Sequence, residues 1–415
     1  MIKKARMKIL IFGINYSPEL TGIGKYTGEM ATWLATNGHE VAAVTALPYY
    51  PEWEIHAAYK GKKWHKEQLD GVTVYRVPLY VPKETNTKKR ILHELSFLGG
   101  ILPSWFSLLL KKKFDVVINI TPPFHLGFYA VFYAKLKGAK LVTHIQDLQI
   151  DAAKDLGMIN NKSLLNLMFK SETYILKNSD WVSSISLGMQ KKILEKGIAK
   201  DKFVMFPNWV DESAIRPLSF EESLRKEWNI PLTDKVILYS GNLGEKQGLE
   251  VIIDAAEYFK DFSDVRFLIV GSGGAKETLQ TRVRERRLSN IYFFPLQPYE
   301  KLSALLAVAD IHLVLQKKSA SDLVMPSKLT GILAAGGCSL VTAMPGTSLY
   351  EVINEHKVGK VVEPESVEAL ISGIRHLLKE DISAYKESAR AYAVENLSKE
   401  RIMKNFESHL YELTG

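Results

Sequence analysis

The sequence predicts an α/β protein with two doubly wound, Rossmann-like domains, each built on a parallel sheet. Short apolar strand patterns alternate with helical patterns along the chain, as in parallel sheets covered by helices. With 415 residues and 46% hydrophobic content, the chain is long and apolar enough for two cores. A glycine-rich loop follows a strand in the middle of the chain, within Lys235–Leu249, where a second domain would begin.

The strands are predicted from aliphatic and β-branched runs bounded by turn residues. In the first half these runs are Lys8–Gly13, Glu40–Thr45, Val72–Val77, Val116–Ile120, Lys140–His144 and Trp181–Ile185. In the second half they are Lys235–Ser240, Val265–Gly271, Ile291–Phe294, Ile311–Leu315, Ser339–Thr342 and Gly359–Val362. Two prolines and several polar residues within Phe206–Pro217 favour a boundary there. We expect domains at residues 1–206 and 207–390, and a C-terminal helix at 391–415 that packs back on the first domain.

Composition narrows the kinds of function. The single cysteine, Cys338, excludes a disulfide framework and a cysteine-based metal cluster, and it suggests a reducing compartment. A net charge of +8 favours an anionic partner, such as a nucleotide, a nucleic acid or an acidic membrane face. The apolar run at the N-terminus is too short for a secretory signal and fits a first strand. No Asp-x-Asp, HExxH or Cys/His ligand spacing occurs in the sequence, so neither a metal nor another cofactor is predicted.

The mid-chain loop SGNLGEKQG (Ser240–Gly248) has the composition of an anion site. Gly241 and Gly248 would let the backbone approach a ligand, and the following helix would present its N-terminus to negative charge. Lys246 would add a mobile positive charge to this anion site. The alternative is an ordinary surface lysine.

A second glycine-containing stretch, SPELTGIGKYTGEM (Ser17–Met30), follows the first strand. Its GxGxxxG spacing, about ten residues after the strand, differs from the dinucleotide-binding pattern. We expect a long loop whose Gly22, Gly24 and Lys25 contact a ligand. A plain strand–helix connection is the alternative.

Several motifs in a fixed order resemble the retaining, two-Rossmann (GT-B) glycosyltransferases of family 4, over nearly the whole chain. They are NWVD (Asn208–Asp211) before a proline, the SGNLGEKQG loop, LIVGSGG (Leu268–Gly274), NIYFFPLQPYEKLSALLAVADIHL (Asn290–Leu313) and MPSKLTGILAAGG (Met325–Gly337). The opening ILIFGINYSPELTGIGKYTGEMATWLATNGHEV and the HIQDL element are most similar to the colanic acid biosynthesis enzymes of that family.

This resemblance implies two domains that face each other across a cleft, and a hexosyltransferase with a nucleotide-sugar donor, GDP- or UDP-linked. The expected reaction moves fucose from GDP-fucose, with retention, to a polyprenyl-diphosphate-linked oligosaccharide in exopolysaccharide or lipopolysaccharide biosynthesis. No nucleic acid partner is expected. Two alternatives remain, a sugar-nucleotide epimerase on the same fold and an inactive nucleotide-sugar-binding subunit.

For the donor side, the resemblance implies an Arg and a Lys in the mid-chain loop. Lys246 matches the Lys, but Asn242 stands at the Arg position and brings no charge. Lys328, next to Ser327 in PSKL, is a candidate replacement. Gly271 and Gly273 complete the expected donor-binding residues.

The family also carries two acids, eight positions apart, before the AAG element. Gly331 and Leu323 stand at those positions here, and Asp322 is the acid nearby. We expect Asp322 to contact the donor, and the alternative is that it begins a turn.

In the first domain, ITPPFHLG (Ile120–Gly127) and THIQDL (Thr143–Leu148) end predicted strands at the ligand-binding edge of a sheet. By register, the family places a His against the donor sugar at Thr121, and His125 follows. His144 and Asp147 would orient the acceptor or accept its proton. Satisfied structural histidines are the alternative. We expect metal-independent retention, in which the donor's diphosphate helps to deprotonate the attacking hydroxyl.

One apolar segment suggests a membrane surface. Ile91–Leu110 is flanked by Lys88-Lys89-Arg90 and Lys111-Lys112-Lys113, and it is too short to span a bilayer. Basic flanks and Trp105 at the boundary favour an interfacial helix, and hence a cytoplasmic protein held peripherally on the anionic inner face of the plasma membrane. The alternative, suggested by Gly99-Gly100 and Pro103, is a buried helix-turn-helix.

Overall fold

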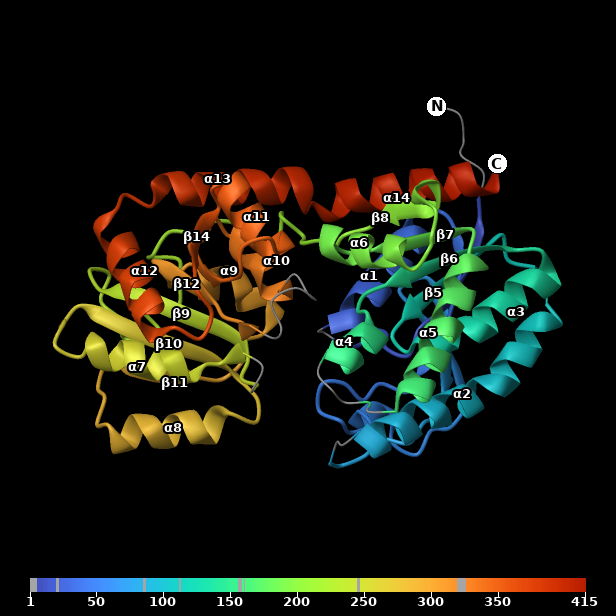
Figure 1. Cartoon of the computed structure of the whole chain (residues 1–415), viewed down its shortest axis with the longest axis horizontal. Coiled ribbons are helices and arrows are strands. Elements are labelled where there is room, and N and C mark those ends of the chain that lie inside the picture. The colour runs from blue at the N-terminus through green and yellow to red at the C-terminus, as the bar shows by residue number, and fades with distance from the viewer. Residues whose placement is uncertain are drawn as a thin grey trace. The chain divides into compact units, whose positions relative to one another are not determined.

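The chain folds into two compact α/β units. The computed structural model describes residues 6–19, 22–84, 87–111, 113–155, 159, 161–244, 247–318 and 326–415. Unit 1 comprises Met1–Pro207 with Met403–Gly415, and unit 2 comprises Asn208–Ile402. Each unit has its own sheet (Figure 1), which confirms the predicted α/β class with two doubly wound sheets.

The sheet of unit 1 has eight strands in the order β3-β4-β2-β1-β5-β6-β7-β8. All neighbouring strands are parallel except the β3–β4 pair. The strands are β1 (Lys8–Phe12), β2 (Glu40–Ala46), β3 (His65–Leu69), β4 (Val72–Val77), β5 (Val116–Thr121), β6 (Lys140–Ile145), β7 (Trp181–Ser184) and β8 (Phe203–Met205). All of these are predicted from the sequence except the edge strands β3 and β8.

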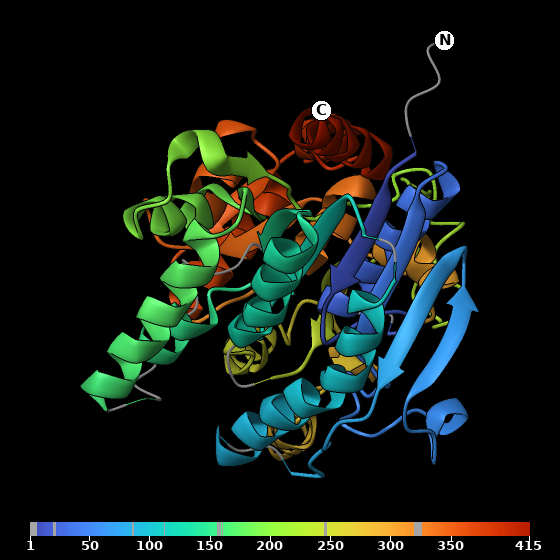
Figure 2. The same cartoon turned by 90° about the vertical axis from the view of Figure 1, so that its right-hand side faces the viewer.

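Helices cover both faces of this sheet. They are α1 (Gly22–Thr36), α2 (Thr87–Leu109), α3 (Gly127–Lys137), α4 (Gln149–Asp155), α5 (Lys162–Lys177), α6 (Leu187–Glu195) and α14 (Lys399–Thr414), with short 3-10 turns η1 (Ala57–Tyr59), η2 (Phe124–Leu126) and η3 (Lys200–Lys202). Figure 2 shows α2 and α3 side by side on one face, where Leu10 and Phe12 of β1 share a core with Phe97 and Ile101 of α2. Because side chains alternate along a strand, the intervening residues of β1 point to the opposite face of the sheet.

The end of α14 is anchored in unit 1 by a ring stack and a buried polar pair. Phe406 stacks on Phe206 with ring centroids 3.9 Å apart. The Nδ1 atom of His39 accepts a hydrogen bond from the Met7 N–H, so its Nε2–H donates to Glu407, 3.0 Å away. These contacts fix one tautomer of the His39 ring.

Residues 22–30 form the first turns of helix α1, so the expectation of a long glycine loop there is wrong. Gly24 and Gly28 lie one helical turn apart and face the preceding segment. A Cβ at Gly24 would stand 2.5 Å from Glu19 Oε2, and one at Gly28 would stand 1.9 Å from Ser17 Oγ. The glycines therefore allow α1 to pack closely against the chain that enters it.

Helix α2 is continuous through Pro103, which makes the helix-turn-helix alternative wrong. Gly100 permits close packing, because a Cβ there would stand 2.3 Å from the Pro78 carbonyl oxygen. Trp105 is a core residue and not a boundary residue: it is 9% exposed, and its indole N–H donates to the Tyr129 carbonyl at 3.0 Å. Lys137 of α3 caps the C-terminus of α2 by donating to the Leu109 carbonyl.

Unit 2 carries a six-stranded parallel sheet in the order β11-β10-β9-β12-β13-β14. Its strands are β9 (Lys235–Asn242), β10 (Val265–Ser272), β11 (Ile291–Phe294), β12 (Ile311–Val314), β13 (Ser339–Thr342) and β14 (Gly359–Val362). Its helices are α7 (Glu250–Tyr258), α8 (Lys276–Glu285), η5 (Tyr299–Lys301), α9 (Leu302–Leu306), α10 (Ser327–Ala334), α11 (Ser348–Glu355), α12 (Val367–Lys379) and α13 (Ser383–Asn396). The strand order reverses between β9 and β12, and open α/β sheets bind ligands beyond the carboxyl ends of the strands at such a point.

Candidate functional site

The carboxyl ends of β9 and β10 approach each other through glycines. Gly271 lies so close to β9 that a Cβ there would stand 1.9 Å from the Gly241 carbonyl oxygen. Gly273, with a φ of +148°, lies against Leu243, whose N–H donates to the Ser272 carbonyl at 2.8 Å. The expected donor-side glycines Gly241, Gly271 and Gly273 thus lie together at one edge of the sheet, where they shape the backbone.

Lys328 places a buried ammonium group at this edge. It is the second residue of α10, and its Nζ lies 3.7 Å from the centroid of the Tyr239 ring on β9. A Cβ at Gly241, whose φ is +136°, would stand 3.2 Å from that Nζ. Within the part of the chain that the structure describes, the Nζ has no hydrogen-bond partner. Burial lowers the pKa of Lys328 to about 7.

Other expected donor residues fall around Lys328 or outside the described residues. Ser327 is exposed at the start of α10, and the side chain of Asn242 at the end of β9 is also exposed. Gly248 has a φ of +63° and lies close to Lys317. Lys246 and Asp322 lie outside the described residues.

The sequence analysis does not identify Gln316, which also belongs to this edge. It follows β12, and its backbone N–H donates to Thr342 Oγ1 at 2.8 Å. Its side-chain Nε2 is buried and has no hydrogen-bond partner among the residues that the structure places. Two buried donors that lack a partner among the described residues, on Lys328 and Gln316, therefore lie next to the switch point between β9 and β12. Unsatisfied buried donors are rare in folded proteins, and their presence here indicates a site for an acceptor-rich ligand.

In unit 1, Thr121 is the last residue of β5, His125 lies in η2 just after it, and Asp147 follows β6. The Thr121 hydroxyl is buried, and it donates weakly to the His144 carbonyl at 3.5 Å. Asp147 is partly exposed just before α4. Gly22 lies near Tyr50, and Lys25 pairs with Glu29 at 3.9 Å on α1.

His144 is enclosed in the sheet. It is 2% exposed, its Nδ1 lies 2.9 Å from Ser183 Oγ, and the Gln146 amide donates to its Nε2 at 2.9 Å. Both ring nitrogens are therefore occupied, and burial lowers the pKa of His144 to about 3. These contacts argue for a neutral, structural ring that holds Gln146 and against direct contact with an acceptor.

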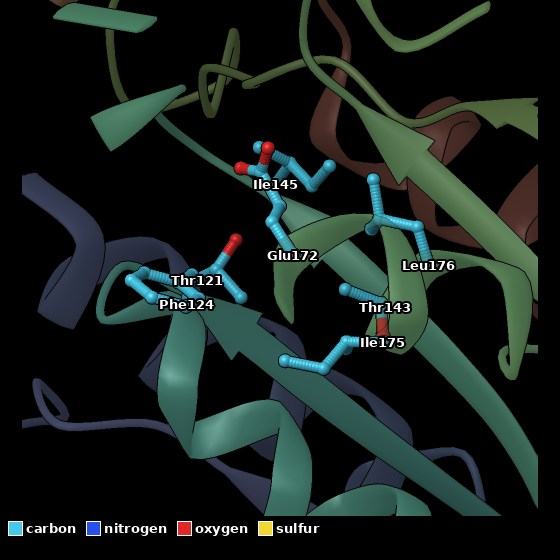
Figure 3. Close-up of a pocket in the computed structure, with 7 residues that line it drawn as sticks. All are labelled: Thr121, Phe124, Thr143, Ile145, Glu172, Ile175 and Leu176. Carbon is cyan, nitrogen blue, oxygen red and sulfur yellow. The ribbon is translucent and has the colours of Figure 1, made fainter. Parts of the chain in front are cut away.

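Between β5, β6 and α5 lies a small pocket that is partly open to solvent (Figure 3). Thr121, Phe124, Thr143, Ile145, Glu172, Ile175 and Leu176 line it. The Glu172 carboxylate accepts from Lys196, which also pairs with Asp151 at 2.5 Å, and burial raises the pKa of Glu172. Because its acid is already paired and its other walls are mostly apolar, this pocket offers a sugar or phosphate few free polar groups.

Glu94 is a further polar residue near His125 that the sequence analysis misses. It lies on α2, where Gln149 of α4 donates to its Oε1 at 2.7 Å and His125 Nε2 stands 3.6 Å from its Oε2. A signal was available in the sequence, because Glu94 is the only acid between residues 87 and 110.

Among the helices described, none is both long and apolar enough to cross a membrane. The placed residues include no cluster of three or more His, Cys, Asp or Glu side chains that could hold a metal ion.

Comparison with known proteins identifies the family. Residues 21–209 match the glycosyl transferase 4-like domain, and residues 220–396 match the glycosyl transferases group 1 domain. The chain is 44% identical over 408 residues to the "Putative colanic acid biosynthesis glycosyl transferase WcaI" of Escherichia coli (strain K12), covering 96% of this chain and 98% of that protein. It is 24% identical to the "Probable glycosyltransferase WbjE" of Pseudomonas aeruginosa, over 71% of this chain and 74% of that one.

Solved structures of the GT-B fold superpose on the chain. Sucrose-phosphate synthase from Thermosynechococcus elongatus has a TM-score of 0.73 at 16% identity, covering 98% of this chain and 99% of that one. Anabaena Alr3699/HepE, determined in complex with UDP and glucose, has a TM-score of 0.69 at 13% identity, covering 98% and 100%. The strong full-length identity to one glycosyltransferase, the two matching domains and this common fold lead to one conclusion: the chain belongs to the group 1 glycosyltransferases with a 4-like N-terminal domain, and it has the GT-B fold.

Proposed function

We propose that this protein transfers a sugar from a nucleotide donor to a lipid-linked acceptor in the biosynthesis of a colanic-acid-type exopolysaccharide. The 44% identity to the E. coli protein named for colanic acid biosynthesis supports the pathway. The UDP complexes of Alr3699/HepE support a nucleotide-sugar donor. We propose fucose from GDP-fucose as the donor and a polyprenyl-diphosphate-linked oligosaccharide as the acceptor.

The donor side rests on one observation: the buried ammonium of Lys328, at the switch point of unit 2, has no hydrogen-bond partner among the residues that the structure describes. A buried cation without a counter-ion is costly, and a phosphate group would supply the missing charge and acceptors. In glycosyl transfer from a nucleotide sugar, negative charge builds on the departing diphosphate. A fixed cation at that place stabilises the charge as it forms. We propose that Lys328 takes the role that an arginine at position 242 would otherwise have, and that Lys246 assists.

The proposed chemistry is retention without a metal ion. The bond between the anomeric carbon and the diphosphate oxygen breaks, and the acceptor oxygen attacks from the same face. The proton of the attacking hydroxyl passes to the departing diphosphate, so charge and atoms balance. This chain's own contribution is to hold the diphosphate with Lys328 and the backbone donors around Gly241.

We also propose that unit 1 docks on an anionic membrane surface through α2. Ile91, Leu95, Leu102 and Phe106 share one side of this helix and are 41–58% exposed. The opposite side, with Phe97 and Ile101, is buried. A helix that is apolar on both its buried and its exposed side indicates an interaction surface, and a polyprenyl-linked acceptor requires the enzyme to reach the lipid headgroups.

A donor screen followed by product analysis tests this function. The folded protein is incubated with GDP-fucose, other GDP-sugars and UDP-sugars, each with lipid extract that contains polyprenyl-linked acceptors, with and without excess EDTA. We expect sugar in the lipid fraction from GDP-fucose, the same anomeric configuration in product and donor by NMR, and no loss with EDTA. An inverted product, or activity that EDTA abolishes and Mg²⁺ restores, would contradict the mechanism.

The same screen examines the inactive-subunit alternative, which Asn242 and Gly331 favour because they stand where the family carries charged residues. A protein that binds a nucleotide sugar but releases no nucleotide with any donor and acceptor would favour that alternative.

A further inference from the structure

A carboxylate, an imidazole and an amide converge at the carboxyl edge of the unit 1 sheet. Glu94 comes from α2, His125 from η2 after β5, and Gln149 from the start of α4 after β6. The Gln149 amide donates to Glu94 Oε1 at 2.7 Å. His125 Nε2 stands 3.6 Å from Glu94 Oε2, which is too far for a hydrogen bond. Three segments far apart in the sequence thus direct polar groups to one place.

This cluster has unused hydrogen-bonding capacity. The Nε2 atom of His125 and the Oε1 atom of Gln149 are buried, and neither has a partner among the residues that the structure describes. Leaving such an atom unsatisfied destabilises the folded protein, because the atom has lost its hydrogen bonds to water. A purely structural cluster would be expected to close these bonds internally. The unused atoms indicate that a ligand completes the site.

The charge state of the cluster suits a neutral ligand rich in hydroxyl groups. Burial lowers the pKa of His125 to about 4, so the ring is neutral at pH 7, and burial raises the pKa of Glu94. The charged group that faces Glu94 along α2 is Arg90, one helical turn earlier, and Tyr49 lies nearby. A carboxylate at the centre disfavours a phosphate. A sugar hydroxyl, by contrast, both donates and accepts, as Gln149 Oε1 and His125 Nε2 require.

An aromatic surface adjoins the polar groups. The Trp53 ring packs against His93, with centroids 5.2 Å apart, and Arg90 lies over it at 5.6 Å. Trp53 is partly exposed and has a φ of +54°, a left-handed conformation that is strained for a bulky residue. Such strain clusters at functional sites. Arg90 therefore links Trp53 to Glu94, which lies one helical turn further along α2 beside His125.

We infer that Glu94, His125 and Gln149, bordered by Trp53, form the binding site for the acceptor carbohydrate. This rests on the proposed function, because it assigns the acceptor to unit 1 while Lys328 of unit 2 takes the donor diphosphate. Glu94 accepts a hydrogen bond from an acceptor hydroxyl, Gln149 and His125 complete the contacts to that group, and the indole supports a sugar ring.

The first test measures carbohydrate binding without any reaction. Saturation-transfer NMR is recorded on the full-length protein with the methyl glycosides of glucose and galactose. The variants are Glu94→Gln and Gln149→Leu, and the matched control is Glu40→Gln, an equal charge change at the amino end of β2. Thermal melts verify that each variant folds. We expect binding of at least one glycoside by the parent and the control, with about a ten- to hundredfold loss in both variants, the scale of one hydrogen bond to a charged group.

The second test uses turnover. With the lipid-linked acceptor, Glu94→Gln and Gln149→Leu should raise the KM for the acceptor about tenfold or more and leave the KM for the donor nucleotide sugar within about twofold. If the parent binds a glycoside and the variants do not, but the parent transfers no sugar, the proposed function is wrong and the carbohydrate site is supported. The site is wrong if both variants have the same acceptor KM or the same glycoside signal as the parent. It is also wrong if the parent binds neither glycoside.

Discussion

The ammonium of Lys328 sits 3.7 Å from the ring centroid of Tyr239, so a cation on helix α10 lies on an aromatic side chain of the central strand β9. The Tyr239 hydroxyl donates to the Asn242 carbonyl at 2.8 Å and so is held to the end of the same strand. A cation–π contact of this kind contributes about 2 kcal/mol or more when both groups are desolvated. It can hold the lysine in place until an anion arrives.

Lys328→Met should weaken binding of the donor nucleotide sugar by tenfold or more at pH 7, because it removes a charge-assisted contact to phosphate. The affinity of the parent should also fall as the pH rises above 7, by up to tenfold per pH unit, because a phosphate raises the pKa of Lys328 and its binding then takes up a proton. Calorimetric titration with GDP-fucose at pH 6, 7, 8 and 9 measures both effects. Lys318→Met, on an exposed lysine paired with Glu363, serves as the control. A parent affinity that does not change with pH would contradict this role.

The same substitution should alter stability in a defined pH window. The pKa of Lys328 is about 7 in the folded state and near 10.5 in the unfolded chain, so the unfolded chain binds more protons between these values. Stability of the parent therefore rises with pH from 7 to about 10. Urea unfolding should show that Lys328→Met is more stable than the parent at pH 6–7, and that the difference shrinks towards pH 10. A difference that is constant with pH would mean that the lysine is charged throughout.

Gly331 offers a test of the missing family acid. It lies inside α10, and a Cβ there would meet, among the described residues, only the Leu306 Cδ1 atom, at 3.7 Å. Gly331→Ala should stabilise unit 2 by about 0.5–1 kcal/mol, because alanine loses less backbone entropy in a helix. Gly331→Glu, compared with Gly331→Gln, should bind the donor nucleotide several-fold more tightly if an acid at this position grips the ribose. Equal affinities of the Glu and Gln variants would count against that placement.

Membrane docking should depend on the exposed side of α2. Changing Leu95, Leu102 and Phe106 to serine should reduce binding to anionic liposomes about tenfold or more, since each buried apolar side chain contributes about 1.5–3 kcal/mol. Sedimentation with phosphatidylglycerol vesicles measures this, and binding should weaken with salt. The control changes Leu232, Tyr258 and Phe262, which are 44–49% exposed on unit 2, to serine. If the α2 variant sediments as well as the control, α2 is not the anchor.

Acid should destabilise the protein through its buried neutral histidines. Burial lowers the pKa of His125 to about 4 and that of His312 to about 3, whereas a histidine in the unfolded chain titrates near 6.5. The unfolded chain therefore binds more protons below pH 6.5, and stability falls as the pH drops. Urea unfolding of His125→Gln should lose less stability than the parent between pH 6.5 and 5, by up to about 2 kcal/mol. The control is His376→Gln, at an exposed histidine, which should lose stability with falling pH as the parent does. If the stability of His125→Gln falls in parallel with that of the parent, His125 is not a neutral buried histidine.

Much of the fold follows from local sequence patterns, because buried parallel strands are short runs of apolar residues. The edge strand β3 escapes prediction, since HKEQL is polar and pairs on one side only, with β4. The prediction of a loop after Ser17 is wrong for another reason. Glycines usually end helices, but Gly24 and Gly28 sit inside α1 because Glu19 and Ser17 fold back against them, a contact between segments that spacing cannot show.

The residues proposed for the donor and those proposed for the acceptor differ in how much of their arrangement can be predicted from the sequence. Lys328 is predicted from its motif, yet its position over Tyr239 and its lack of a partner among the described residues emerge only from the packing of α10 against β9. Glu94 lies within an apolar helix, and its meeting with His125 and Gln149 depends on how α2 crosses the sheet edge. Side chains gathered from three distant segments are the part that local patterns do not reveal.

Transfer of sugar from a nucleotide donor to a lipid-linked acceptor is the central claim, and acceptor-dependent release of nucleotide tests it most directly. The folded parent and Lys328→Met are incubated with radiolabelled GDP-fucose, with and without polyprenyl-diphosphate-linked oligosaccharide, and both free GDP and labelled lipid are counted. We predict that the parent releases GDP and labels the lipid in equal amounts only when the acceptor is present, and that Lys328→Met does so at least 10²-fold more slowly. A parent that binds the donor but neither releases GDP nor labels the lipid, or a Lys328→Met variant that matches it, would contradict the account.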